Sequence, residues 1–128
     1  MERCERAVEY KHNGFNCCAA VLMAYADKTG MDEMTVRRTG VTFGSGMGSF
    51  DATCGALIGA QIVLGWLKFE GKPMHAMARE LFESFEKACG ATVCRDLKGI
   101  DTGKVICSCD NCVRNAVICL DEFLSKNI

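Results

Sequence analysis

Cysteine is the residue type through which this sequence could do most of its chemistry. Ten of the 128 residues are cysteine, close to the content at which cysteine alone predicts a special role. In its thiolate form this side chain is a nucleophile and a ligand for soft metals. The cysteines are Cys4, Cys17, Cys18, Cys54, Cys89, Cys94, Cys107, Cys109, Cys112 and Cys119.

The densest group of thiols is the C-x-C-x-x-C run at Cys107, Cys109 and Cys112. Thiols at this spacing around a helix start can converge on one metal ion. Zinc would need a fourth ligand from elsewhere, such as Cys94, and would give a structural interaction module. Alternatively, Cys109 and Cys112 could form the attacking and resolving pair of a thiol–disulfide oxidoreductase or redox sensor. The spacing of these cysteines is compatible with both a zinc site and a thiol–disulfide pair.

The rest of the composition argues against several classes of function. Fifteen basic and sixteen acidic residues give a net charge of −1 without a block of either sign, so we expect neither nucleic-acid nor membrane binding. The first residues show no apolar run with a cleavage site, which predicts a cytoplasmic protein. Clustered thiols in a reducing compartment are more often metal ligands or catalytic groups than structural disulfides. The absence of Cys-x-x-Cys-His argues against covalently attached haem.

Helical periodicity predicts an all-α, single-domain bundle of about five to six helices that spans residues 1–128. The expected helices cover residues 2–11, 15–28, 32–39, 51–69, 73–89 and 110–126, and residues 91–108 are expected to be irregular. Isolated cysteines on apolar helix faces, namely Cys4, Cys18 and Cys119, are interpreted as small buried core residues.

Several other cysteines fall near predicted helix starts. Cys17 follows Gly14, Cys54 follows the glycine-rich loop 44–49, and Cys109 precedes the last helix. Unpaired N–H groups and the macrodipole at a helix N-terminus stabilise negative charge, which lowers the pKa of a nearby thiol. If these segments meet in space, they would form a pocket of thiolates.

Four short motifs, each containing one cysteine, are distributed along the chain. The run from Cys54 to Ala60 reads C-G-A-L-I-G-A and follows the glycines of 46–48. Cys17 precedes an alanine-rich segment, Cys94 precedes Arg-Asp-Leu, and Cys109 begins an apolar segment. Over residues 13–125 these motifs resemble the C_GCAxxG_C_C family of redox-active proteins, which has four characteristic cysteines.

The resemblance implies specific site residues and a cofactor. The functional cysteines would be Cys17, Cys54, Cys94 and Cys109, with Cys112 as the alternate to Cys109. The family is also similar to the non-haem part of split-Soret cytochromes, where this region is associated with an iron–sulfur cluster and a dimer. We therefore expect a [2Fe–2S]-type centre, electron transfer or redox sensing with a partner protein, a homodimer and no haem.

Overall fold

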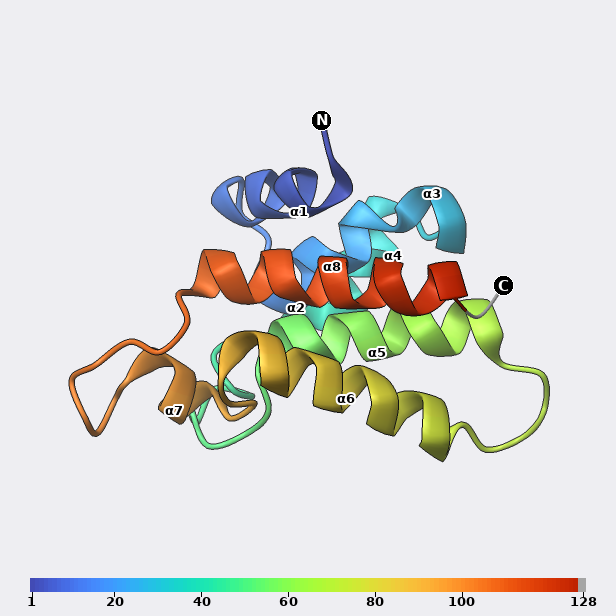
Figure 1. Ribbon diagram of the computed structural model, residues 1–128. Coiled ribbons are helices and arrows are strands. Elements are labelled where there is room, and N and C mark those ends of the chain that lie inside the picture. Colours follow the sequence, from blue (N-terminus) through green and yellow to red (C-terminus); the bar gives the residue numbers. More distant parts are fainter. Residues whose placement is uncertain (127–128) are drawn as a thin grey trace.

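The computed structural model describes residues 1–126, and in this range the chain folds into eight α-helices (Figure 1). They are α1 (Arg3–His12), α2 (Cys17–Ala24), α3 (Ala26–Thr29), α4 (Glu33–Gly40), α5 (Gly55–Lys68), α6 (His75–Cys89), α7 (Cys94–Lys98) and α8 (Cys109–Lys126), with a 3₁₀ turn, η1 (Val41–Phe43), after α4. Apart from one antiparallel bridge between Thr53 and Val93, the described residues form no β-structure. The all-α prediction is confirmed, whereas the predicted number of five to six helices is too low.

The two additional helices have different causes. The helix predicted over residues 15–28 is interrupted at Tyr25, which leaves α3 as a single separate turn. The buried Tyr25 hydroxyl donates a hydrogen bond to the Asp121 carboxylate at 2.6 Å, so the break is fixed by a distant contact with α8. α7 lies in the segment predicted to be irregular. Five residues ended by the left-handed Gly99 (φ 65°) are too few for apolar periodicity to be visible.

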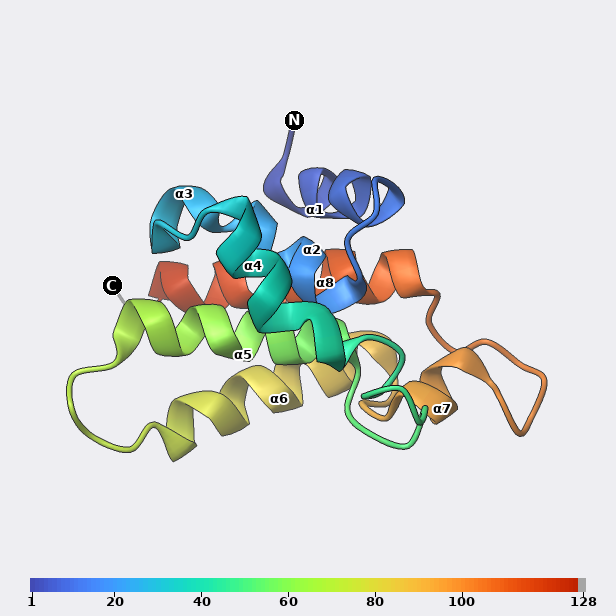
Figure 2. The same cartoon turned by 180° about the vertical axis from the view of Figure 1, so that it is seen from behind.

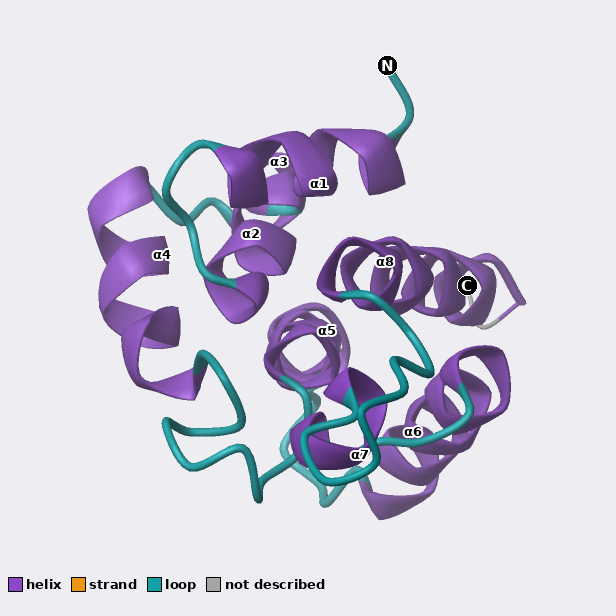
Figure 3. Ribbon diagram, turned by 90° about the vertical axis from the view of Figure 1, so that its left-hand side faces the viewer, coloured by secondary structure: helices purple, strands orange, loops and turns teal. Residues whose placement is uncertain are grey.

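α5 is the central helix of the bundle (Figure 3). α2, α6 and α8 all pack against it, and α6 returns antiparallel to it after a loop (Figure 1). α2 is almost entirely buried, which explains why its eight residues, CCAAVLMA, include no charged side chain. No helix among the described residues has both the length and the apolar character needed to cross a membrane.

Small residues set the close approach of α5 to its neighbours. A Cβ atom added to Gly59 would lie 2.7 Å from the carbonyl oxygen of Cys18 in α2. A Cβ atom on Gly55 would lie 2.6 Å from the carbonyl oxygen of Phe43 in η1. Real Cβ atoms do not come so close to backbone oxygens, so both positions require glycine. This packing places the beginning of α5 beside the beginning of α2, and therefore brings Cys54 towards Cys17.

Candidate thiol site

Four cysteines mark the beginnings of four helices. Cys17, Cys94 and Cys109 are the first residues of α2, α7 and α8, and Cys54 is the N-cap residue of α5. All four line one small cavity, which Cys107 and Cys112 also line. This end of the bundle faces the viewer in Figure 3. The structure thus brings together all four residues to which the family resemblance points.

Local capping contacts explain why the helices begin at the cysteines. The Asn16 side chain accepts a hydrogen bond from the N–H of Ala19 at 2.8 Å and donates one to the carbonyl of Gly40 at 2.9 Å. Ser108 accepts one from the N–H of Asn111 at 3.1 Å. The capping residues lie one position before Cys17 and Cys109, so α2 and α8 begin at these cysteines and both thiols lie in a first helical turn. The Cys54 side chain makes no capping hydrogen bond, but the backbone N–H groups of Ala56 and Leu57 in the first turn of α5 lower the pKa of its thiol.

The isolated β-bridge between Thr53 and Val93 places Cys54 and Cys94 on the same side of the paired segments. The N–H of Cys54 donates to the carbonyl of Thr92 at 2.8 Å, and the N–H of Cys94 donates to that of Ala52 at 3.0 Å. Because successive residues in extended chains point to opposite sides, both cysteines lie on the side opposite to the bridged residues Thr53 and Val93. A two-residue pairing therefore directs two thiols from distant segments to the same side.

The glycine-rich loop between η1 and α5 covers the cavity beside α7 (Figure 2). The N–H of Arg95 donates to the carbonyl of Phe50 at 2.6 Å, and the Arg95 guanidinium pairs with Asp51 at 2.7 Å. Gly46 has a φ of 59°, and an added Cβ would lie 2.7 Å from the Cβ of Cys94. Gly46 is therefore in direct contact with the site, whereas Gly48, with a φ of 77°, has no atoms within 4 Å of such a Cβ.

This difference gives a matched pair of variants. Gly46→Ala is expected to displace Cys94 and to lower the amount of metal that the protein retains at least about threefold, because the added methyl group overlaps the Cys94 side chain. Gly48→Ala carries the same positive-φ strain but meets no neighbour, so it should retain metal as the unmodified chain does. Metal content per folded chain measures both; equal losses in the two variants would attribute the effect to backbone strain alone.

The charges around the cavity favour the thiolate form at two positions. The thiol of Cys17 donates a hydrogen bond to Cys109 and, with the Lys98 ammonium nearby, lowers the pKa of Cys109 to about 5. A hydrogen bond from Cys112 and the N–H groups of α5 lower the pKa of Cys54. The same hydrogen bond to Cys109 raises the pKa of Cys17, and burial raises that of Cys94. At neutral pH the metal-free site therefore holds a thiolate at Cys109, and the pKa of Cys54 is lower than that of an ordinary thiol.

The pH dependence of thiol reactivity tests this charge distribution. Because the Cys109 pKa of about 5 lies below the ordinary range, its alkylation by iodoacetamide in the reduced, metal-free protein should be nearly constant from about pH 6.5 to pH 8.5. An ordinary thiol would react tens of times faster at the upper end of this range. Cys17→Ala and Lys98→Met should each raise the Cys109 pKa and restore the pH dependence. Mass spectrometry of the labelled peptides identifies the residue; an unperturbed profile for Cys109 would contradict the assignment.

The size of the cavity limits what it can hold. About 300 Å³ of space lies between its atoms, part of it open to solvent, but the centre of a water molecule fits in only about 10 Å³ of it. This is room for roughly one water molecule. The cavity therefore suits an ion or a compact inorganic group bound directly to the thiols and does not suit an organic substrate.

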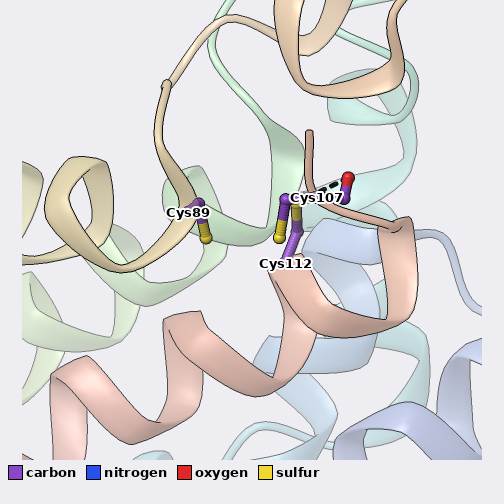
Figure 4. Close-up of side chains that lie close together, drawn as sticks. All are labelled: Cys89, Cys107 and Cys112. Atoms are coloured by element: carbon purple, nitrogen blue, oxygen red, sulfur yellow. Dashed lines mark hydrogen bonds between the residues drawn. The ribbon is translucent and has the colours of Figure 1, made fainter. Parts of the chain in front are cut away.

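A second group of thiols lies beside the first. The sulfur atoms of Cys89, Cys107 and Cys112 are all within 4.8 Å of one another, and all three residues are buried (Figure 4). The Cys112 thiol donates a hydrogen bond to the carbonyl oxygen of Cys107 at 3.7 Å, and its sulfur is next to Cys54 and Cys89, so Cys112 lies between the two groups. This buried cysteine group could hold a metal ion.

The C-x-C-x-x-C run is thus divided between two groups: Cys109 lies against Cys17, whereas Cys107 and Cys112 join Cys89. Neither Cys89 nor Lys98 is among the site residues that the sequence predicts. Cys89 is the last residue of an amphipathic helix, and Lys98 is one turn after Cys94 on a helix that was not predicted. The only available signal for Lys98 was this i,i+4 spacing.

The fold and the site define a class of helical proteins with a buried cavity lined by thiols at helix N-termini. A family model described as "Putative redox-active protein (C_GCAxxG_C_C)" matches residues 15–123. The chain belongs to this redox-active family. Comparisons with curated proteins and with solved structures give no match.

Proposed function

We propose that this protein holds an iron–sulfur centre of the [2Fe–2S] type through Cys17, Cys54, Cys94 and Cys109 and serves in electron transfer or redox sensing. The observation that carries the proposal is that four thiols, each at the beginning of a different helix, line a single buried cavity. Thiolates are the usual ligands of iron–sulfur clusters, and four of them complete a [2Fe–2S] centre.

The spacing of the thiols favours a dinuclear centre over a single ion. Among the described residues, no three of these four sulfurs lie within 4.8 Å of one another. Cys17 and Cys109 are hydrogen-bonded to one another, and Cys54 and Cys94 lie diagonally across the β-bridge on the same side of it. Two pairs of thiols suit two metal ions, whereas one ion would require all four sulfurs to approach a single point.

The surrounding residues would tune such a centre. When bound, an iron–sulfur centre accepts and releases single electrons. The N–H groups in the first turn of α5 lower the pKa of Cys54, and the Lys98 ammonium lies beside Cys94 and Cys109. Both features stabilise negative charge and therefore favour the reduced state. Leu97, fully buried in the cavity wall, limits access of water.

Thiol–disulfide exchange is a second candidate function. It is favoured by the contact between Cys17 and Cys109 and by the low pKa of Cys109. The resolving thiol would then be Cys17, since Cys112 lies instead against Cys54 and Cys89. A zinc module built on Cys107, Cys109 and Cys112 has less support, because Cys109 is outside the group that the other two form.

Electron paramagnetic resonance distinguishes these functions. Protein purified without oxygen and reduced with dithionite should show about one unpaired spin per chain, as a singly reduced [2Fe–2S] centre does. A spectrum without such a signal, from protein that forms a Cys17–Cys109 disulfide, would favour thiol–disulfide exchange.

We also propose, as the family resemblance suggests, that the chain is a single domain that forms a dimer. It would exchange electrons with a redox partner protein in the cytoplasm.

A further inference from the structure

We infer that Cys89, Cys107 and Cys112 form a second metal site that binds one thiophilic d¹⁰ ion of the Cu(I) type. It lies beside the proposed iron–sulfur centre, because Cys107 and Cys112 also line the cavity of that centre. The three residues come from the end of α6, the loop before α8 and the first turn of α8. Cys89 and Cys107 are outside the four positions that the family pattern marks. Figure 4 shows the three side chains side by side.

The geometry is close to what one ion requires. The three sulfurs lie within 4.8 Å of one another. Around an ion with metal–sulfur bonds of about 2.3 Å, three sulfurs in a plane lie about 4 Å apart. A movement of less than roughly 1 Å by each side chain therefore completes the coordination, without a change in the backbone.

The backbone and one side chain hold the three thiols in place. The N–H of Cys107 donates to the carbonyl of Leu97 at 3.2 Å, and the N–H of Cys112 donates to that of Ser108 at 2.8 Å. The side-chain amide of Asn115 donates to the sulfur of Cys89 at 3.3 Å and lies 4.0 Å from that of Cys107. Hydrogen bonds of this kind orient metal ligands and stabilise their charged form.

These contacts separate the group from ordinary core cysteines. A single buried cysteine is usually a small apolar residue. Here three of them converge, and a polar amide donates to two of their sulfurs. An apolar contact would need neither the convergence nor the amide.

The number of ligands selects the class of ion. No fourth cysteine, histidine, aspartate or glutamate of the described residues has a ligand atom within 4.8 Å of all three sulfurs. Structural zinc is almost always four-coordinate, whereas soft thiolate ligands select Cu(I). Cys54, the thiol next to Cys112, belongs to the first site. Three-coordinate binding of a soft monovalent ion therefore fits best.

The test is a competition for Cu(I) between the reduced, metal-free protein and a colorimetric Cu(I) chelator in the absence of oxygen. The most tightly bound equivalent should be weakened at least about 100-fold in Cys89→Ser, and about tenfold in Asn115→Leu, where only the supporting hydrogen bonds are lost. Cys4→Ser, which removes a thiol that is hydrogen-bonded to the Glu2 and Glu5 carboxylates and lines neither site, should leave the affinity unchanged. Circular dichroism verifies that each variant is folded.

Two results would overturn the inference. One is an unchanged Cu(I) affinity in Cys89→Ser with a loss in Cys17→Ser, which would move the ion to the first site. The other is a preference of the three thiols for Zn(II) over Cu(I). The iron and sulfide contents of Cys89→Ser are independent of this outcome and should equal those of the unmodified chain. Failure of the second site is therefore distinguishable from failure of the proposed iron–sulfur centre.

Discussion

Cys54→Ser is expected to reduce bound iron and acid-labile sulfide from about two of each per chain to nearly none. Cys54 is buried at the N-cap of α5 and lines the same cavity as Cys17, Cys94 and Cys109. Serine is a favoured N-cap residue, so the substitution should leave α5 intact. Its hydroxyl is a poor ligand for the soft metals that thiolates select. The loss is therefore expected without unfolding.

The control is Cys4→Ser, which replaces another buried cysteine that lies outside the cavity. This variant should keep its full iron and sulfide content. Anaerobic metal analysis and the visible spectrum report both results, and circular dichroism reports the helix content. Full iron content in the Cys54 variant would show that Cys54 is not a ligand.

Gly59→Ala is expected to lower the free energy of unfolding by about 1–3 kcal/mol, the usual cost of overpacking a tight contact. The added methyl group would lie 2.7 Å from the Cys18 carbonyl oxygen, a backbone atom of the buried helix α2. This overlap can be relieved only if α2 and α5 move apart. Because Cys17 and Cys54 begin these two helices, the separation should also weaken metal binding.

Gly65→Ala is the matched control in the same helix. An added Cβ at Gly65 has no neighbouring atom within 4 Å, so alanine should stabilise the chain by up to about 1 kcal/mol through its higher helix propensity. Denaturant unfolding of the metal-free proteins measures both changes. Equal effects of the two substitutions would contradict the close α2–α5 packing.

Much of the site follows from signals that are local in the sequence. Cys17 and Cys54 lie in the first turns of predicted helices and Cys109 directly precedes one, and the structure has helix N-termini at all three. The predicted helix over residues 51–69 nevertheless begins four residues later, at Gly55. The chain before it is extended because it pairs with the segment around Val93, and that pairing is long-range.

The residues that the sequence did not reveal depend on tertiary contacts. Cys89 meets Cys107 and Cys112 only because α6 and α8 pack together. Lys98 reaches the cavity through α7, a helix too short to show periodicity. The division of the C-x-C-x-x-C run between two groups likewise depends on which helix start each thiol faces. Spacing along the chain could not distinguish these arrangements.

The most direct test of the central claim is the iron, zinc and acid-labile sulfide content of the intact protein purified without oxygen. The four-thiolate centre predicts about two iron atoms and two sulfides per chain, with a visible spectrum that dithionite bleaches. Colourless protein with zinc alone, or with no metal at all, would contradict an iron–sulfur centre at Cys17, Cys54, Cys94 and Cys109.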